Sequence, residues 1–165
     1  MDKALYVLAQ FDDDTQEILC RYYENLVSHG ITGTQTKDIP YHFTMEIYPV
    51  EAKGLLQHGL DSICTDIAGI TIRFDHIGLF GLNVLFLAPE VTHELLDFHD
   101  RLAVESSAEQ FPWTPHVTLL IDEPQTVLKA LPVIAESLKP LTVRIDRIGL
   151  YEFFPKRLVR EYRLK

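Results

Sequence analysis

The sequence predicts a single mixed domain of class α+β, in which a strand–helix–strand–helix–strand unit occurs twice and one further strand follows. Apolar residues switch between strand and helical spacing along the chain, whose 165 residues are a usual length for one domain. In addition, residues 71–80 (TIRFDHIGLF) resemble residues 142–151 (TVRIDRIGLY). Shared β-strand composition could explain part of this likeness, but the matching Arg, Asp and Gly positions favour an internal duplication. We predict two pseudo-symmetric repeats, over about residues 1–81 and 82–165.

The first repeat opens with an apolar strand and a capped helix. Asp14 resembles the N-cap of a capping box because Glu17 stands three residues later, and Gly30 ends the helical pattern. The predicted elements of this repeat are a strand over 4–11, a helix from Asp14 to Gly30, a strand over 41–48 closed by Pro49, a helix over about 51–68 and a strand over 69–80.

The second repeat has the same order of elements. Thr92 can cap its first helix, because a threonine hydroxyl accepts hydrogen bonds from helical backbone N–H groups. The predicted elements are a strand over 82–89, a helix from Thr92 to about residue 106, a strand over 116–121, a helix over about 126–138, a strand over 141–154 and, after a turn at 155–156, a last strand over 158–164.

The charge of the chain restricts its partners. A net charge of −9 argues against binding along a long nucleic acid duplex, since that mode needs many contacts from Lys and Arg to phosphates. The charge is uneven, because residues 156–165 contain five basic side chains and one acid. A small phosphorylated substrate or a single RNA end fits this distribution.

The apolar runs and cysteines indicate the cellular setting. No apolar run approaches the roughly 20 residues needed to cross a bilayer, and the first residues do not resemble a secretory signal. Cys20 and Cys64 lack metal-binding spacing and are expected to be free buried thiols. We therefore expect a cytoplasmic protein without membrane partners. The sequence does not encode a visible sign of its oligomeric state, for which a monomer is the simplest expectation.

Two His-x-Thr motifs occupy the same predicted strand of the two repeats. They are His42-Phe43-Thr44-Met45 and His116-Val117-Thr118-Leu119. A single His-x-Thr is weak evidence of function, since a hydrogen-bonded histidine on a half-buried strand would explain it. The matched positions are what make the pair informative. Because alternate residues of a strand share a face, each His and its Thr should point one way and the apolar residues the other.

This set of side chains suits phosphodiester chemistry. If the two repeats face each other, two imidazoles and two hydroxyls surround one small anion. A neutral imidazole can take a proton from a nucleophile while an imidazolium gives one to the leaving oxygen, because histidine titrates near neutral pH. Threonine hydroxyls can donate to the phosphate oxygens where charge develops. This chemistry needs neither a metal ion nor a cofactor, and His93 and His99 are too far apart for the zinc helix motif.

Paired His-x-Thr motifs on a duplicated chain of this length resemble the 2H phosphoesterase superfamily, which includes the bacterial 2′-5′ RNA ligase-like proteins. The resemblance implies a bilobal fold of two antiparallel sheets, flanked by helices around a central cleft. It implies that both His–Thr pairs are catalytic. Members cleave 2′,3′-cyclic phosphates, 1″,2″-cyclic phosphates or 2′-5′ linkages, and some join RNA ends. The first motif departs mildly from the family pattern, with Tyr41 where proline is frequent and Met45 where leucine is usual.

Further residues near the motifs have two interpretations each. Glu46 could orient a histidine, although a solvated strand end is favoured. Lys156 and Arg157 could reach a phosphate from the rim of the cleft, or could be charges that protect an edge strand. Trp113, with Phe111, could stack on a base, but packing of this loop on the core is the safer interpretation.

Three functions remain open at the level of the sequence. The leading hypothesis is hydrolysis of a cyclic or 2′-5′ phosphodiester in a small cyclic phosphate, a nucleotide or an RNA terminus. The second is RNA end joining, in which the same residues run the reaction in reverse. The third is a non-catalytic module that senses nucleotides or phosphate, against which the retention of all four motif side chains argues.

Overall fold

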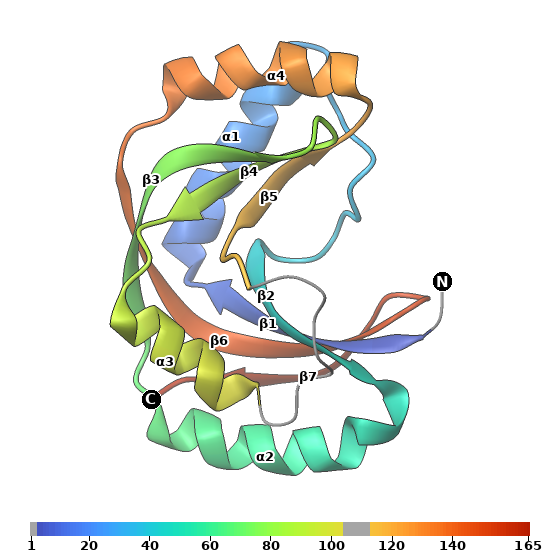
Figure 1. Cartoon of the computed structure of the whole chain (residues 1–165), viewed down its shortest axis with the longest axis vertical. Helices are drawn as coiled ribbons and strands as arrows, with labels where there is room; N and C mark the ends of the chain where they lie inside the picture. Colours follow the sequence, from blue (N-terminus) through green and yellow to red (C-terminus); the bar gives the residue numbers. More distant parts are fainter. Residues whose placement is uncertain (1–2, 104–112) are drawn as a thin grey trace.

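A computed structural model shows seven strands and four α-helices in the described residues, which are 3–103 and 113–165. Their order alternates as the sequence predicts (Figure 1). The elements are β1 (Ala4–Phe11), α1 (Asp13–Ser28), β2 (His42–Pro49), a 3₁₀ turn (Val50–Ala52), α2 (Lys53–Asp66), β3 (Ile70–Phe80), β4 (Val84–Pro89), α3 (His93–Leu102), β5 (Val117–Ile121), α4 (Pro124–Ser137), β6 (Leu141–Phe153) and β7 (Arg157–Arg163).

Every strand pair is antiparallel, as the family resemblance implied, and the two expected sheets share the long strand β6. One part of β6, Arg147–Phe153, pairs with β1 and β7, and β2 adds to β1. The other part, Leu141–Ile145, pairs with β3, which continues to β4 and β5. The hydrogen bonds therefore join both sheets into one seven-stranded network in the order β2-β1-β6-β3-β4-β5, with β7 beside β6.

The register between β3 and β6 is symmetric. Thr71 pairs with Arg144 and Arg73 pairs with Thr142, so the two repeats contribute the same residue types at exchanged positions. This register supports the proposal of two pseudo-symmetric repeats. Each end of the molecule has one helix from each proposed repeat: α1 and α4 lie together at one end, and α2 and α3 at the other (Figure 1).

Local sequence signals predicted the N-cap of α3 and the glycine that ends α1, but not the N-cap of α1. Asp12, rather than Asp14, is the N-cap of α1, and its side chain accepts from the Thr15 N–H at 2.9 Å. The reason is that the Asp12 N–H donates to the Arg144 carbonyl, which holds Asp12 as the last extended residue of this segment. Thr92 caps α3 as predicted, and the end expected near residue 106 lies outside the described residues. Gly30 follows α1 with φ +77°, as a helix-ending glycine does.

Three phenylalanines lie at the centre of the core. Phe11, Phe43 and Phe74 are fully buried, and their ring centroids are 5.3–5.8 Å apart in edge-to-face arrangements. Phe43 is the middle residue of the first His-x-Thr motif. Its burial therefore fixes which face of β2 is turned toward the core and which carries His42 and Thr44.

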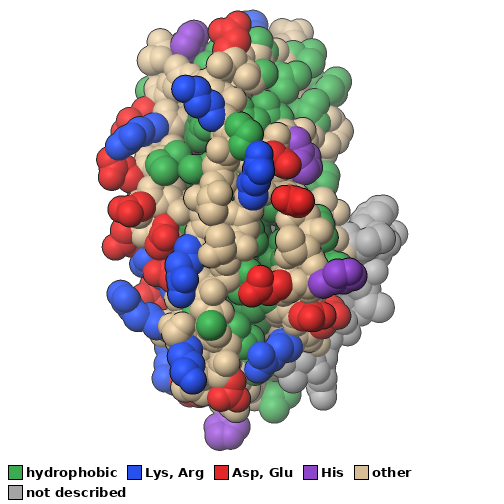
Figure 2. Space-filling view, turned by 90° about the vertical axis from the view of Figure 1, so that its left-hand side faces the viewer, with side chains coloured by type: hydrophobic (Ala, Val, Ile, Leu, Met, Phe, Trp, Pro, Cys, Tyr) green, Lys and Arg blue, Asp and Glu red, His purple; other side chains and the backbone are tan. Residues whose placement is uncertain are grey.

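The two cysteines differ in exposure, and charged side chains of both signs share the surface. Cys64 is buried, whereas Cys20 is exposed on α1, which corrects the expectation that both thiols are buried. Side chains of both signs are interspersed on the face shown in Figure 2. Within 156–165, Arg157 pairs with Glu152 and Arg160 pairs with Asp61. In the parts of the chain that the structure describes, no helix is long and apolar enough to cross a membrane.

Candidate active site

The two motifs are presented by strands with the same irregularity. Thr44 lies opposite Leu8 in the β1–β2 ladder, and Thr118 lies opposite Phe86 in the β4–β5 ladder. In both ladders the register shifts directly after the threonine. A β-bulge of this kind ends the simple alternation of side chains and turns the strand. In each strand the regular alternation of side chains therefore includes the His and the Thr of the motif and ends directly after the Thr.

The alternation within the motifs is as predicted. His42, Thr44, His116 and Thr118 are partly exposed, whereas Phe43 and Met45 on β2 are buried with relative exposures of 0% and 1%. The residues between and after His116 and Thr118 are equally buried, at 1% each. The apolar residues thus anchor the strands, while the polar ones face away from the core.

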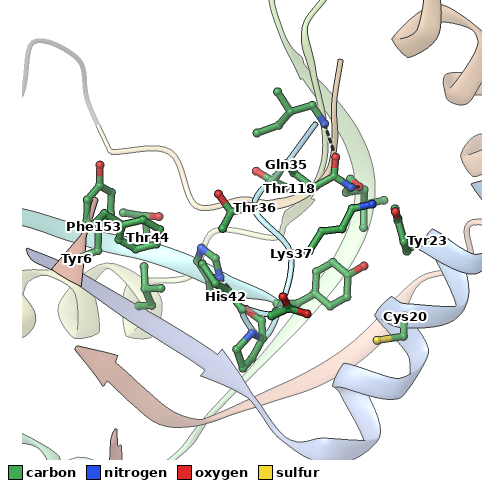
Figure 3. Close-up of a pocket in the computed structure, with 17 residues that line it drawn as sticks. Tyr6, Cys20, Tyr23, Gln35, Thr36, Lys37, His42, Thr44, Thr118 and Phe153 are labelled. Atoms are coloured by element: carbon green, nitrogen blue, oxygen red, sulfur yellow. Dashed lines mark hydrogen bonds between the residues drawn. The ribbon is translucent and has the colours of Figure 1, made fainter. Parts of the chain in front are cut away.

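A cavity of about 690 Å³ lies along the first motif and reaches the second. His42, Thr44 and Thr118 line it (Figure 3). His116 lies beside these residues rather than in the cavity wall, with its ring against Phe80 and Phe86 at centroid distances of 4.7 and 5.2 Å. Its charge nevertheless acts on His42, whose pKa it lowers. Three of the four predicted side chains thus line one cavity, and His116 lies close enough for its charge to act on His42.

Both imidazoles are oriented by the same type of hydrogen bond. Nδ1 of His42 is 2.7 Å from the Pro40 carbonyl oxygen, and Nδ1 of His116 is 2.7 Å from the Thr114 carbonyl oxygen. A carbonyl can only accept, so we assign the proton of each neutral ring to Nδ1. Nε2 is then the atom that can accept a proton, or donate one when the ring is charged.

Burial sets the protonation of the two rings. It lowers the pKa of His42 most strongly, while the bond to the Pro40 carbonyl raises this pKa and the charge of His116 lowers it further. Burial also lowers the pKa of His116, and the bond to the Thr114 carbonyl raises it. Both rings therefore lose their protons more readily than an ordinary histidine, and a charge on one disfavours a charge on the other.

The cavity continues on both sides of His42. Tyr6 and Phe153 lie on the side of Thr44, with their ring centroids 4.6 Å apart. Lys37, Tyr23 and Cys20 lie on the other side (Figure 3). The cavity can accordingly hold a ligand with an aromatic group as well as a phosphate.

Two glutamines that sequence reasoning did not single out hold the walls of the cavity. Nε2 of Gln16 donates to the Tyr41 carbonyl, and its Oε1 accepts from the Tyr41 N–H, both at 2.8 Å. Gln35 makes similar bonds with the edge of β5, at Leu119 and Ile121. No signal in the sequence distinguishes such side chains, because their partners are backbone groups of distant segments.

The three residues predicted to bind substrate have other partners. Lys156 donates to the carbonyls of Lys37 and Asp38, at 2.9 and 3.1 Å, and so holds a loop of the cavity wall. Arg157 pairs with Glu152 at 2.7 Å. Trp113 stacks on His99 with a centroid distance of 4.1 Å, so packing is confirmed for this residue. Phe111 lies outside the described residues.

Glu46 differs from its expectation as a solvated residue. It is buried, with 3% exposure, and its Oε1 is 3.0 Å from the Ile47 N–H. The physical reason is the bulge, since Glu46 follows the register shift that a strict alternation could not anticipate. As for metals, no group of three or more His, Cys, Asp or Glu that could hold an ion occurs in residues 3–103 and 113–165.

The order of elements and the paired motifs are those of the 2H phosphoesterase superfamily, and the family match confirms the resemblance seen in the sequence. The chain belongs to the 2′-5′ RNA ligase superfamily, because the sequence model of that superfamily matches residues 36–153. No curated protein sequence matches the chain.

Solved structures show the same fold over the whole chain. The apo crystal structure of E. coli LigT is 15% identical with a TM-score of 0.67, and the match covers 100% of this chain and 99% of LigT. TT0787 of Thermus thermophilus is 14% identical with a TM-score of 0.68, over 98% and 97% of the two chains. A phosphoesterase is 17% identical with a TM-score of 0.65, over 99% of each chain. At these identities the likeness establishes the fold.

Proposed function

We propose that this protein is a metal-independent phosphoesterase that hydrolyses a 2′,3′-cyclic, 1″,2″-cyclic or 2′-5′ phosphodiester. The observation that carries the proposal is the matched orientation of two imidazoles. Each Nδ1 is bound to a carbonyl two residues earlier in the chain, at 2.7 Å in both motifs. Each Nε2 is left to exchange protons, which is what a general acid and a general base require.

Each ring keeps its proton on Nδ1. Hydrolysis needs one further proton on the two Nε2 atoms together, so that one ring is neutral and the other is an imidazolium. Water attacks phosphorus while the neutral imidazole accepts a water proton at Nε2. The bond from phosphorus to the ribose oxygen breaks, and the imidazolium donates its Nε2 proton to that oxygen. The products are a phosphomonoester and a free hydroxyl, which stay on the same ribose when the substrate is a cyclic phosphate, and the two Nε2 atoms again carry one proton, now on the other ring. Because a charge on His116 lowers the pKa of His42, the singly protonated state is favoured over the doubly protonated one.

The threonines complete the mechanism. Thr44 and Thr118 line the same cavity from β2 and β5. Their hydroxyls donate to the two non-bridging oxygens, whose negative charge grows as water adds to phosphorus. Hydrogen bonds that strengthen in the transition state lower the barrier rather than only binding the substrate.

The cavity favours a nucleotide or an RNA terminus as substrate. Its volume of about 690 Å³ is larger than a cyclic phosphate alone requires, and Tyr6 and Phe153 provide aromatic surface. Crystal structures of E. coli LigT contain 3′-AMP, ATP, NADP+ or phosphate, which supports the same class of ligand here. The net charge of −9 disfavours a long duplex.

The test is a panel of 2′,3′-cyclic nucleotides, ADP-ribose cyclic phosphate and 2′-5′ oligonucleotides, assayed with wild type, His42→Ala and His116→Ala. We expect turnover of at least one substrate, resistance to EDTA, and a decrease of about a hundredfold or more in kcat for either variant. His29→Ala is the matched control, because His29 also has Nδ1 near a carbonyl, that of Asn25 at 2.8 Å, but is the C-cap residue of α1 and belongs to neither motif. Full activity of His42→Ala or His116→Ala contradicts the proposal.

The superfamily description makes end joining the second candidate. With a 5′-hydroxyl in place of water, the same proton transfers join a 2′,3′-cyclic end to a 5′-hydroxyl end through a 2′-5′ linkage, and the ribose 3′ oxygen leaves with the proton of the imidazolium. Analysis of the products formed from RNA with these two ends separates the reactions: joined RNA indicates ligation, and a phosphomonoester end indicates hydrolysis. Nucleotide binding without turnover of any substrate indicates a sensor instead.

A further inference from the structure

A hydrogen bond links the two motif segments. The indole N–H of Trp113 donates to the main-chain oxygen of Thr44 at 2.9 Å. Thr44 belongs to the first motif on β2, whereas Trp113 lies three residues before His116, on the segment that leads into β5. The bond therefore crosses between the two repeats at the level of the candidate active site.

The position of β2 explains why this carbonyl accepts a side-chain donor. In the described residues, β2 is the last strand of the sheet order and pairs along one edge, with β1. The register also shifts directly after Thr44. Backbone groups at a sheet edge need partners from outside the sheet. Trp113 provides one at the residue whose hydroxyl faces the phosphate in the proposed mechanism.

The indole is held firmly enough to act as a link. Its ring stacks on the His99 ring of α3, with a centroid distance of 4.1 Å and an interplanar angle of 20°. The His99 side chain is 15% exposed. Stacking occupies one face of the indole, so its N–H points in a defined direction, toward Thr44.

The other end of the link is His116. The carbonyl of Thr114, next to Trp113, accepts from Nδ1 of His116 at 2.7 Å. The intervening Pro115 is buried and restricts the backbone. A displacement of Trp113 is accordingly passed to the carbonyl that orients the His116 ring.

We propose that Trp113 is a positioning residue that fixes the separation of the two His–Thr pairs by tying β2 to the segment that carries His116. Its kinetic consequence rests on the proposed function. An acid and a base on opposite sides of a phosphate must both be in place at once, and a shift of about 1 Å can cost about a hundredfold in rate. Binding of the substrate depends less on this separation, because it uses the whole cavity.

The test uses the fact that Trp113 is the only tryptophan of the chain. Growth with β-(3-benzothienyl)alanine in place of tryptophan exchanges the indole N–H for sulfur and preserves ring size and stacking. Trp113→Phe is the second variant. We expect kcat to fall at least about tenfold, with KM within about threefold of wild type. Tyr48→Phe is the matched control, because it removes a donor to the Leu102 carbonyl at 3.0 Å on the same strand, outside the active-site cavity. A kcat within about twofold of wild type for both Trp113 variants overturns the proposal.

A second readout does not depend on turnover. In NMR titrations of the free protein, His116→Ala is expected to shift the titration midpoint of His42, because the two rings interact. The same His116→Ala shift is then measured in protein that also carries Trp113→Phe, where we expect it to be at most half as large. An unaltered change overturns the positioning role even if no substrate is turned over. If wild type shows no turnover but the coupling does fall, the proposed function fails and the role of Trp113 stands.

Discussion

At the scale of single residues, the chemistry of the candidate active site depends on what each imidazole and each hydroxyl is bound to. The Nδ1–carbonyl bonds fix both tautomers, and burial lowers both pKa values. The same hydrogen bonds would raise these pKa values in the absence of burial. Burial thus has the larger effect on the protonation of each ring.

The lowered pKa values predict an acidic optimum for kcat/KM. In the free enzyme both histidines titrate below the ordinary value of 6.5, so the singly protonated pair is most abundant below pH 6.5. Because kcat/KM reports the free enzyme, it should form a bell centred below pH 6.5. A bound phosphodiester anion favours the imidazolium, so the bell of kcat should lie at higher pH. Profiles of both constants check this, and a kcat/KM optimum at or above about pH 7.5 contradicts it.

The threonine hydroxyls should contribute to kcat. Thr44→Val or Thr118→Val removes one donor to the phosphate, and loss of one such donor typically lowers kcat by about a hundredfold or more. Thr→Ser at the same positions keeps the hydroxyl and should recover most of the activity. Thr36→Val is the control, because Thr36 lines the same cavity from a loop outside the motifs. Steady-state kinetics decide the matter, and a decrease of less than about twofold in both valine variants would exclude the role.

At the scale of elements, each motif strand has one face in the core and one in the cleft. On β2 the core face is anchored by Phe43, between Phe11 and Phe74. Its backbone is held from outside the sheet, by Trp113 at Thr44 and, just before the strand, by Gln16 at Tyr41. Packing of Phe43 therefore decides which face of β2 lies against the core, and hydrogen bonds from other elements fix the position of its backbone.

Phe43→Ala should destabilise the fold through this strand. Phe43 is fully buried, and a buried phenylalanine truncated to alanine usually lowers the free energy of unfolding by about 3–5 kcal/mol. Equilibrium denaturation with urea measures the change. Leu128→Ala is the control, because Leu128 is 50% exposed on α4 and should change stability by less than about 1 kcal/mol. A change of that small size for Phe43→Ala would show that the aromatic cluster does not anchor β2.

At the scale of the whole molecule, the cleft exists because two sheets share one strand. β6 pairs with β1 and β7 along one part and with β3 along the other. A glycine lies two strands away from each motif threonine. Gly149 is opposite Leu8, the partner of Thr44, and Gly78 is opposite Phe86, the partner of Thr118. An added Cβ would meet the Tyr151 ring in the first case and the Phe86 ring in the second.

Gly78→Ala should therefore reduce activity through His116. A methyl group at this position would overlap the Phe86 ring, which packs on the His116 ring at 5.2 Å. Moving Phe86 displaces His116, and we expect kcat/KM to fall about tenfold or more. Gly54→Ala serves as the control, since nothing lies within 4 Å of the added methyl group and helical alanine is favoured over glycine. Kinetics and thermal unfolding of both variants test this, and wild-type kcat/KM in a folded Gly78→Ala would refute it.

Local patterns of residues were enough to predict the elements, their order and the four side chains of the motifs. Apolar spacing distinguishes a strand from a helix, and alternation decides which residues of a strand share a face. The similarity of residues 71–80 to residues 142–151 then indicated that the two His-x-Thr motifs occupy corresponding strands. Because these signals are local, they misplaced the N-cap of α1 and the environment of Glu46. The first depends on a bond from Asp12 to Arg144, and the second on a register shift.

The way in which the motifs are held could be learned only from the folded chain. The partners of Trp113, Lys156 and Gln16 are backbone carbonyls and N–H groups far away in the chain. Every residue has a backbone carbonyl, so no pattern of letters reveals which ones a side chain will meet. Residue types and periodicity are written in the sequence, whereas the meeting of distant backbone groups follows from packing the other strands and the helices around β6.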